Sequence, residues 1–127
     1  MKTKIKIYTQ TSGWIEAQVD SNRNPDTAKH ILEALPISGK TQTWGKEIYF
    51  PISVEMHEEN TQVEVEIGDL AYWPPGNSFC IFFGKTPASR GDKPAAASPV
   101  NVFGKIKGNI SGFLDVPSGE TIRIELG

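Results

Sequence analysis

The densest chemical feature of the sequence is a group of aromatic side chains in its middle third. Neighbouring residues of a strand point to opposite faces, so Tyr49 and Phe50, or Tyr72 and Trp73, cannot both enter one core. We expect most of these rings to pack in the core and several to border a concave ligand site, since rings supply the apolar area that such sites use. The group comprises Trp44, Tyr49, Phe50, Tyr72, Trp73, Phe79, Phe82 and Phe83.

Groups for nucleophilic, metal or cofactor chemistry are sparse. His30 and His57 are the two histidines; no serine or cysteine near them has a nucleophile context, and neither a Gly-x-Ser-x-Gly turn nor a glycine-rich phosphate loop occurs. His57 lies among Glu55, Glu58 and Glu59, but without the ligand spacing of a zinc or calcium site. We therefore expect a charged surface connection there, and no metal, no cofactor and no hydrolytic triad.

Charge and composition argue against further classes. Thirteen basic and fifteen acidic residues give a net charge of -2, and no run of Lys and Arg could follow a phosphate backbone, so we expect no nucleic-acid partner. Residues 2–7 alternate as in a strand and not as in a secretory leader, and no stretch has membrane-spanning length. These features predict a cytoplasmic protein without membrane contact. Cys80, between Phe79 and Ile81, is predicted to be a buried, unreactive thiol.

The elements that must position these groups are mostly strands. Period-two alternation predicts strands with one solvent-exposed face at Lys4–Tyr8, Trp14–Val19, Gln62–Ile67 and Thr121–Leu126. Nearly continuous apolar runs predict central strands, covered on both faces or in a sheet that curls on itself, at Glu47–Ile52, Asp69–Trp73 and Phe79–Phe83. A chain of 127 residues is long enough to bury one core, so we expect one mostly β domain, as a barrel or sandwich.

One segment has helical periodicity. Asn24 is the expected N-cap, Pro25 the first helical residue, and Pro36 ends the segment, so a helix is predicted over about residues 25–35. Its apolar stripe should close an open end of a barrel, with His30 in solvent. Residues Lys85–Ser98 are rich in Pro, Ala, Gly and Ser and predict one long irregular loop. The stripe consists of Ala28, Ile31, Leu32 and Leu35.

Four ordered blocks resemble the small cyclophilin-like proteins of bacteria and archaea. The blocks are Trp44–Phe50, Ile67–Gly76, Cys80–Pro87 and Ser98–Ile106. The resemblance runs over nearly the whole chain, and the family has no established activity. It implies a closed eight-stranded β-barrel of cyclophilin type, with the short helix capping one end.

Two traces also resemble cyclophilins proper, namely Phe82-Phe83 and Val102–Ile106. Isomerases of that family use a groove arginine that weakens the double-bond character of the proline amide, whose rotation barrier is about 18–20 kcal/mol. None of Arg23, Arg90 and Arg123 lies in the strand where that arginine would be, Val100 takes the place of the groove histidine, and the loop has no groove tryptophan. The catalytic set is not carried over, and we expect no catalysis.

The sequence therefore favours a non-catalytic module that binds a small molecule or an extended peptide in an aromatic groove, with the Lys85–Ser98 loop as its rim. Rings would supply apolar area, while hydroxyl, amide and carboxyl groups would orient the polar part of the ligand. Alternatives are a weak prolyl isomerase, or a subunit or regulator of a larger amidohydrolase-type assembly; edge pairing or an apolar patch could also give a homodimer. The candidate ligand-binding residues are Trp44, Glu47, Tyr49, Tyr72, Phe82, Phe83, Thr86, Ser98 and Asn101.

Overall fold

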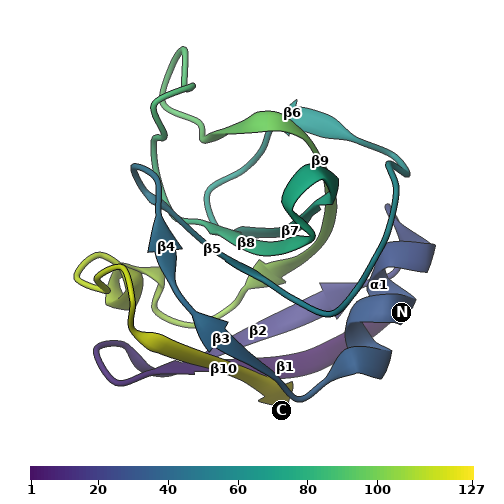
Figure 1. Cartoon of the computed structure of the whole chain (residues 1–127), viewed down its shortest axis with the longest axis horizontal. Helices are drawn as coiled ribbons and strands as arrows, with labels where there is room; N and C mark the ends of the chain where they lie inside the picture. The colour runs from purple at the N-terminus through teal and green to yellow at the C-terminus, as the bar shows by residue number, and fades with distance from the viewer.

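The computed structural model of the chain describes residues 1–127 as a strongly curved β-sheet with one α-helix across one end (Figure 1). The helix α1 is Pro25–Ala34, and two 3-10 helices are η1, Pro74–Gly76, and η2, Ile110–Phe113. The strands are β1 Lys2–Thr9, β2 Gly13–Asp20, β3 Ile37–Lys40, β4 Gln42–Thr43, β5 Glu47–Pro51, β6 Gln62–Glu64, β7 Asp69–Trp73, β8 Ser78–Phe82, β9 Ala95–Ile106 and β10 Thr121–Leu126. The mostly β fold with one α-helix is confirmed.

The hydrogen-bonded order of the strands is β3-β10-β1-β2-β9-β7-β8-β5-β4, with β6 paired to β9 outside this path. The expected closed eight-stranded barrel is not confirmed, because the sheet has ten strands and its end strands β3 and β4 are not paired. Only Thr41 separates these two strands in the chain, and there the chain changes partner from β10 to β5. Thr41 is held at this bend, since its N–H donates to Glu120 O (2.9 Å) and its Oγ1 donates to Pro117 O (2.7 Å).

All seven predicted strands are present, and alternation explains the outer ones. In β1, β2 and β10 every second side chain is buried inside the curve, which is the arrangement that gives a strand one wet face. The prediction for Gln62–Ile67 is too long: after Glu64 the chain turns, and the Glu66 N–H donates to Asp69 Oδ2 (2.9 Å) instead of continuing a ladder. Strands β3 and β4 were not predicted.

The apolar side chains form two clusters, one on each face of β7 and β8. The larger cluster fills the inside of the curved sheet and includes Phe79, whose ring contacts those of Phe50 and Phe103. The smaller cluster lies on the outer face and includes Cys80 and Phe82. Burial on both faces confirms the interpretation of the continuous apolar runs as central strands. Cys80 is fully buried, as expected.

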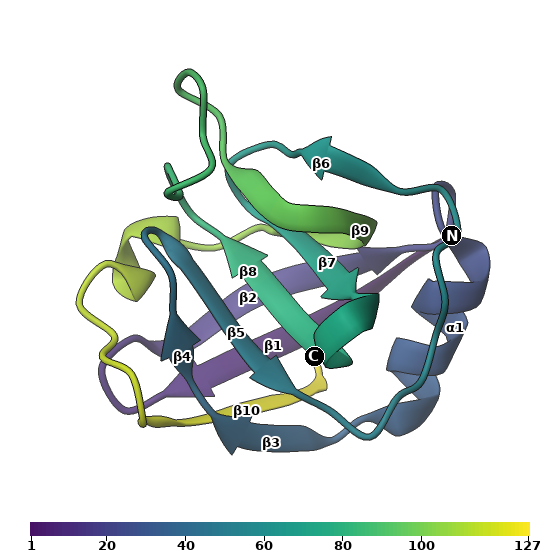
Figure 2. The same ribbon diagram turned by 45° about the horizontal axis from the view of Figure 1, so that its top comes forward.

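The outer cluster exists because β9 is a twelve-residue strand that changes partners along its length. Its second half pairs with β7 and β2, whereas its first half pairs with β6 and covers the outer face (Figure 2). The predicted irregular loop Lys85–Ser98 is therefore too long, because its last four residues, from Ala95 onward, belong to β9. Ala, Pro and Ser have weak strand propensity, and pairing with β6 overrides it.

Helix α1 covers one end of the curved sheet, as predicted. Ala28 and Ile31 are fully buried in the main cluster, and His30 is exposed. Asn24 is the N-cap residue, as predicted, but its side chain makes no capping hydrogen bond to the helix. Asn24 is buried, its Oδ1 accepts from the Asn60 N–H (2.7 Å), and its Nδ2 donates to Val102 O (2.7 Å). No helix has the length and apolar character needed to cross a membrane.

Glu59, predicted only as part of a charged surface connection, caps the helix instead. Its carboxylate oxygens accept the N–H groups of Asp26 and Thr27, both at 3.1 Å, and the Thr27 hydroxyl at 2.8 Å. Carboxylates at a helix N-terminus satisfy free N–H donors and complement the helix dipole.

Replacing Glu59 by alanine should destabilise the protein. Loss of a capping side chain costs about 1 kcal/mol, so Glu59→Ala should lower the free energy of unfolding in urea by roughly that amount. Glu58→Ala is the matched control, because the exposed Glu58 makes no such bonds and should change stability by less than about 0.5 kcal/mol. Equal effects of the two substitutions would contradict the capping role.

Candidate functional site

A pocket of about 230 Å³ opens on the outer face of the sheet, between the start of β5, the end of β7 and the first half of β9. Its wall is almost entirely apolar, with three large aromatic rings and a single acidic group. Each of these rings is only half-buried, in contrast to the fully buried rings of Tyr72 on β7 and of Phe79 and Phe82 on β8. The lining residues are Trp44, Glu47, Tyr49, Trp73, Ala96, Ala97 and Val100.

A tight turn between β4 and β5 places Trp44 beside Glu47. The Trp44 N–H donates to Glu47 O (2.9 Å) and the Glu47 N–H donates to Trp44 O (3.2 Å), so the two residues form a closed pair. Gly45 has φ +59°, and a Cβ there would lie 2.9 Å from Pro87 Cδ. Glycine is required at this position because the turn has a left-handed conformation and packs directly against the connection that leaves β8.

Tyr49 and Trp73 form the opposite part of the wall. Tyr49 follows Glu47 by two residues and so projects from the same face of β5. Its ring meets that of Trp73 edge to face, with centroids 6.3 Å apart and an interplanar angle of 75°. The Trp73 Nε1–H donates to Ser98 Oγ at 2.7 Å, and this bond across to β9 sets the orientation of the indole.

Glu47 is a buried carboxyl group without a basic partner. It is 6% exposed, and no Lys, Arg or His lines the pocket. The Cys80 thiol on β8 donates to Ser78 O (3.8 Å) and lies beside the Glu47 carboxyl group. Burial raises the pKa of Glu47 to about 7, an effect that the thiol partly opposes. Burial, and then the neighbouring Glu47, raise the pKa of the Cys80 thiol well above its ordinary value.

The structure brings together five of the nine residues expected to bind a ligand. Trp44, Glu47 and Tyr49 line the pocket directly. Ser98 does not line the pocket itself but accepts the hydrogen bond from Trp73, which does. Phe82 is fully buried in the outer cluster beneath the pocket, where it supports the wall without lining it.

Tyr72 and Asn101 do not line the pocket. Tyr72 is buried in the main cluster, and its hydroxyl donates to Val54 O (2.6 Å). Asn101 is also fully buried; its Nδ2 donates to Thr27 Oγ1 (3.1 Å) and its Oδ1 accepts from the Glu59 N–H (3.0 Å). The polar atoms of both side chains are therefore occupied by hydrogen bonds, either to the main chain or to helix α1.

Phe83 and Thr86 also lie outside the pocket lining. Phe83 packs against the main cluster, with its ring centroid 6.1 Å from that of Phe113. The Thr86 hydroxyl donates to Ala95 O and accepts from the Ala88 N–H (3.2 Å). Thr86 therefore closes the base of the loop that joins β8 to β9.

Four lining residues were missed by sequence reasoning: Trp73, Ala96, Ala97 and Val100. The signal for Trp73 was present, since Tyr72 and Trp73 must point to opposite faces, and Tyr72 was chosen as the ligand contact. No local signal marked Ala96 and Ala97, because they fall in a stretch whose composition predicted an irregular loop. The described residues contain no cluster of three or more His, Cys, Asp or Glu that could hold a metal ion.

The chain resembles known proteins over almost its full length. The sequence model of the family described as Cyclophilin-like matches residues 3–125. The solution structure of the hypothetical protein AF2241 from Archaeoglobus fulgidus is similar, with 39% sequence identity and a TM-score of 0.83, covering 99% of this chain and 95% of that chain. No curated protein matches the sequence. The resemblance found in the four sequence blocks is thereby confirmed.

The protonation of Glu47 should be visible in the pH dependence of stability. Its pKa is about 7 in the folded state and near 4.5 when unfolded, so the folded state binds this proton more tightly. The resulting stabilisation is full below about pH 4.5 and is lost as the pH rises through 7, an effect of up to about 3 kcal/mol.

Glu47→Gln, which cannot ionise, should remove this contribution. Urea unfolding at pH 5 and pH 8 should show that the wild-type protein loses stability relative to the variant as the pH rises. A constant difference between the two proteins over this range would mean that Glu47 titrates normally.

Proposed function

Since this chain belongs to the cyclophilin-like family, we propose that it is a non-catalytic binding module whose outer pocket accepts a small molecule or one side chain of an extended peptide. The observation that carries the proposal is the set of half-buried rings, Trp44, Tyr49 and Trp73, around a hollow beside a buried acid. Aromatic rings left partly exposed around a concavity, with one polar group at its base, are typical of ligand sites.

The size of the pocket restricts what can enter. Its volume of about 230 Å³ is below the range of roughly 300–1,000 Å³ that holds drug-sized ligands. A fragment, or the end of one side chain, fits this volume, whereas a folded partner would have to make most of its contacts outside the pocket. We therefore place the specific contacts of any ligand in the pocket and the remaining ones on its rim.

The loop between β8 and β9 is the proposed rim. It projects from the body of the protein in both ribbon views (Figures 1 and 2). Its base is tied to the pocket, because the Lys46 N–H donates to Lys85 O (2.8 Å) and Pro87 packs against Gly45. A peptide that placed one side chain in the pocket would pass close to this loop, and loops of this kind often carry binding contacts on a rigid scaffold.

The proposal predicts that ligand binding requires Trp73 and does not require the exposed Trp14. Small fragments such as tert-butanol, phenol, N-methylacetamide, butylamine and Ala-Pro should shift the amide NMR signals of Glu47, Tyr49 and Trp73. Trp73→Leu should weaken the tightest of these fragments at least tenfold. Trp14→Leu is the control, since Trp14 lies on β2 outside the pocket and is 50% exposed. Amide signals that do not shift with any fragment, or that shift equally in both variants, would contradict the proposed function.

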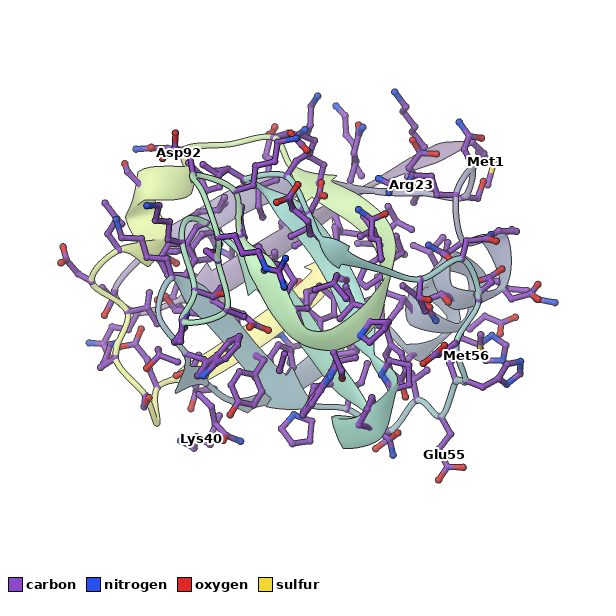
Figure 3. All side chains as sticks on the ribbon, turned by 90° about the horizontal axis from the view of Figure 1, so that it is seen from above. Met1, Arg23, Lys40, Glu55, Met56 and Asp92 are labelled. Carbon is purple, nitrogen blue, oxygen red and sulfur yellow. The ribbon has the colours of Figure 1, made fainter.

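Prolyl isomerisation has little support in the geometry. No arginine lines the pocket: Arg123 is paired with Glu125, and Arg90 is exposed in the loop between β8 and β9. Arg23 is exposed in the connection between β2 and α1, on the same side of the molecule as Met1 in Figure 3. Without a cation to hydrogen-bond the proline nitrogen, the double-bond character of the amide is not weakened.

We therefore expect no acceleration of cis-trans exchange in a protease-coupled assay with a proline tetrapeptide at micromolar protein. A true cyclophilin in parallel serves as the positive control. A rate increase proportional to protein concentration, and abolished by Trp73→Leu, would replace the binding module by an isomerase.

A further inference from the structure

The pocket wall has a one-sided electrostatic character. Its only ionisable groups are the Glu47 carboxyl group and the Tyr49 phenol, and no cationic side chain reaches it. The nearest lysine in sequence, Lys46, packs its stem over Gly84, and Lys85 is 3.9 Å from Asp92. An anionic ligand would thus meet an acid and the negative faces of aromatic rings, with nothing to neutralise its charge.

Glu47 is aimed into this space without a strong partner. The side chain is more than nine-tenths buried, yet it has neither an ion pair nor a hydrogen bond from a nitrogen donor. Every side-chain nitrogen and oxygen atom that is fully buried in this protein has a hydrogen-bond partner. A buried carboxyl group that faces a pocket can therefore accept a hydrogen bond from a donor group on a ligand.

Three rings complete the surroundings of that carboxyl group. The turn holds Trp44 next to Glu47, and Tyr49 and Trp73 contact each other edge to face in the pocket wall. The bond from Trp73 Nε1 to Ser98 holds the indole in place. Tryptophan and tyrosine faces attract cations through their quadrupole, and cages of such rings beside an acid are suited to ammonium groups.

We infer that the pocket selects a cationic amine, as an alkylammonium or methylated ammonium group that contacts the three rings and pairs with the Glu47 carboxylate. This inference rests on the proposed binding function and narrows it to one chemical class of ligand. A methylated ammonium suits the site best, because it is weakly hydrated, offers apolar methyl groups to the wall, and fits a cavity of about 230 Å³.

Binding of such a cation should depend on pH. The pKa of Glu47 is raised to about 7 by burial, so near neutral pH about half of the free protein carries a neutral carboxyl group. The titratable groups that face it are Cys80 on β8, whose pKa is raised further, and Tyr49 on β5. A cation pairs only with the ionised form, so its apparent affinity should fall about tenfold between pH 8 and pH 6.

The test compares choline with 3,3-dimethylbutan-1-ol, its neutral analogue in which carbon replaces nitrogen. Both are titrated into the intact protein at pH 8, with sodium chloride holding the ionic strength constant. The readouts are the backbone amide signals of Glu47, Tyr49 and Trp73 and the indole N–H signals. Trp14 is the internal control, because its ring is exposed on another part of the sheet. Choline should bind at least tenfold more tightly than the alcohol.

Glu47→Gln keeps the shape of the side chain and removes its charge. This variant should lose the preference for choline over the alcohol and the pH dependence of choline binding. A wild-type protein that binds the alcohol as well as choline, or a variant that retains the preference, would overturn the cation assignment. Absence of choline binding would overturn it as well.

These outcomes are separable from failure of the binding function. If the neutral fragments bind in a Trp73-dependent manner while choline does not, the pocket remains a ligand site and only its charge preference is wrong. If no fragment of the wider set binds, the proposed function itself fails.

Discussion

The change of partner along β9 is the constraint on which the rest of the architecture depends. One half of this strand belongs to the curved sheet, and the other half leaves it to pair with β6 over the outer face. Gly104 lies in the half that remains, where a Cβ would be 2.4 Å from Gln18 O, so only glycine allows β9 and β2 to approach this closely. Without the departing half there would be no outer cluster and no pocket, because Ala96, Ala97 and Val100 all come from it.

A polar network locks this arrangement to the helix. Asn24 and Asn101 are fully buried amides from distant parts of the chain, and both bind the segment between β5 and β6 as well as the strand or helix opposite. Glu59, in the same segment, supplies the helix cap. Buried amides that satisfy main-chain groups on several elements rigidify a fold. Asn101 was predicted to bind a ligand, whereas in the structure its side chain joins α1 and the segment before β6 to β9.

Local periodicity was sufficient to predict most strands and the helix from the sequence, because side-chain alternation reports directly which face of an element is buried. Three features lay beyond it. The bend at Thr41, the strand at Ala95 and the cap from Glu59 each depend on partners more than 30 residues away in sequence. The site was predicted only in part for the same reason. Alternation shows that Tyr72 and Trp73 point to opposite faces, but the position of the first half of β9 determines which of the two rings lines the pocket.

The bend at Thr41 also bears on how the protein behaves when crowded with copies of itself. An open sheet has two lateral strands whose unpaired N–H and C=O groups can recruit a foreign strand, and proteins must guard them against aggregation. Here those two strands are a four-residue and a two-residue segment joined through one buried threonine, so neither offers a long straight template. By splitting its lateral strand at a kink, the chain limits intermolecular β-addition without the hydrogen-bonded closure of a complete barrel.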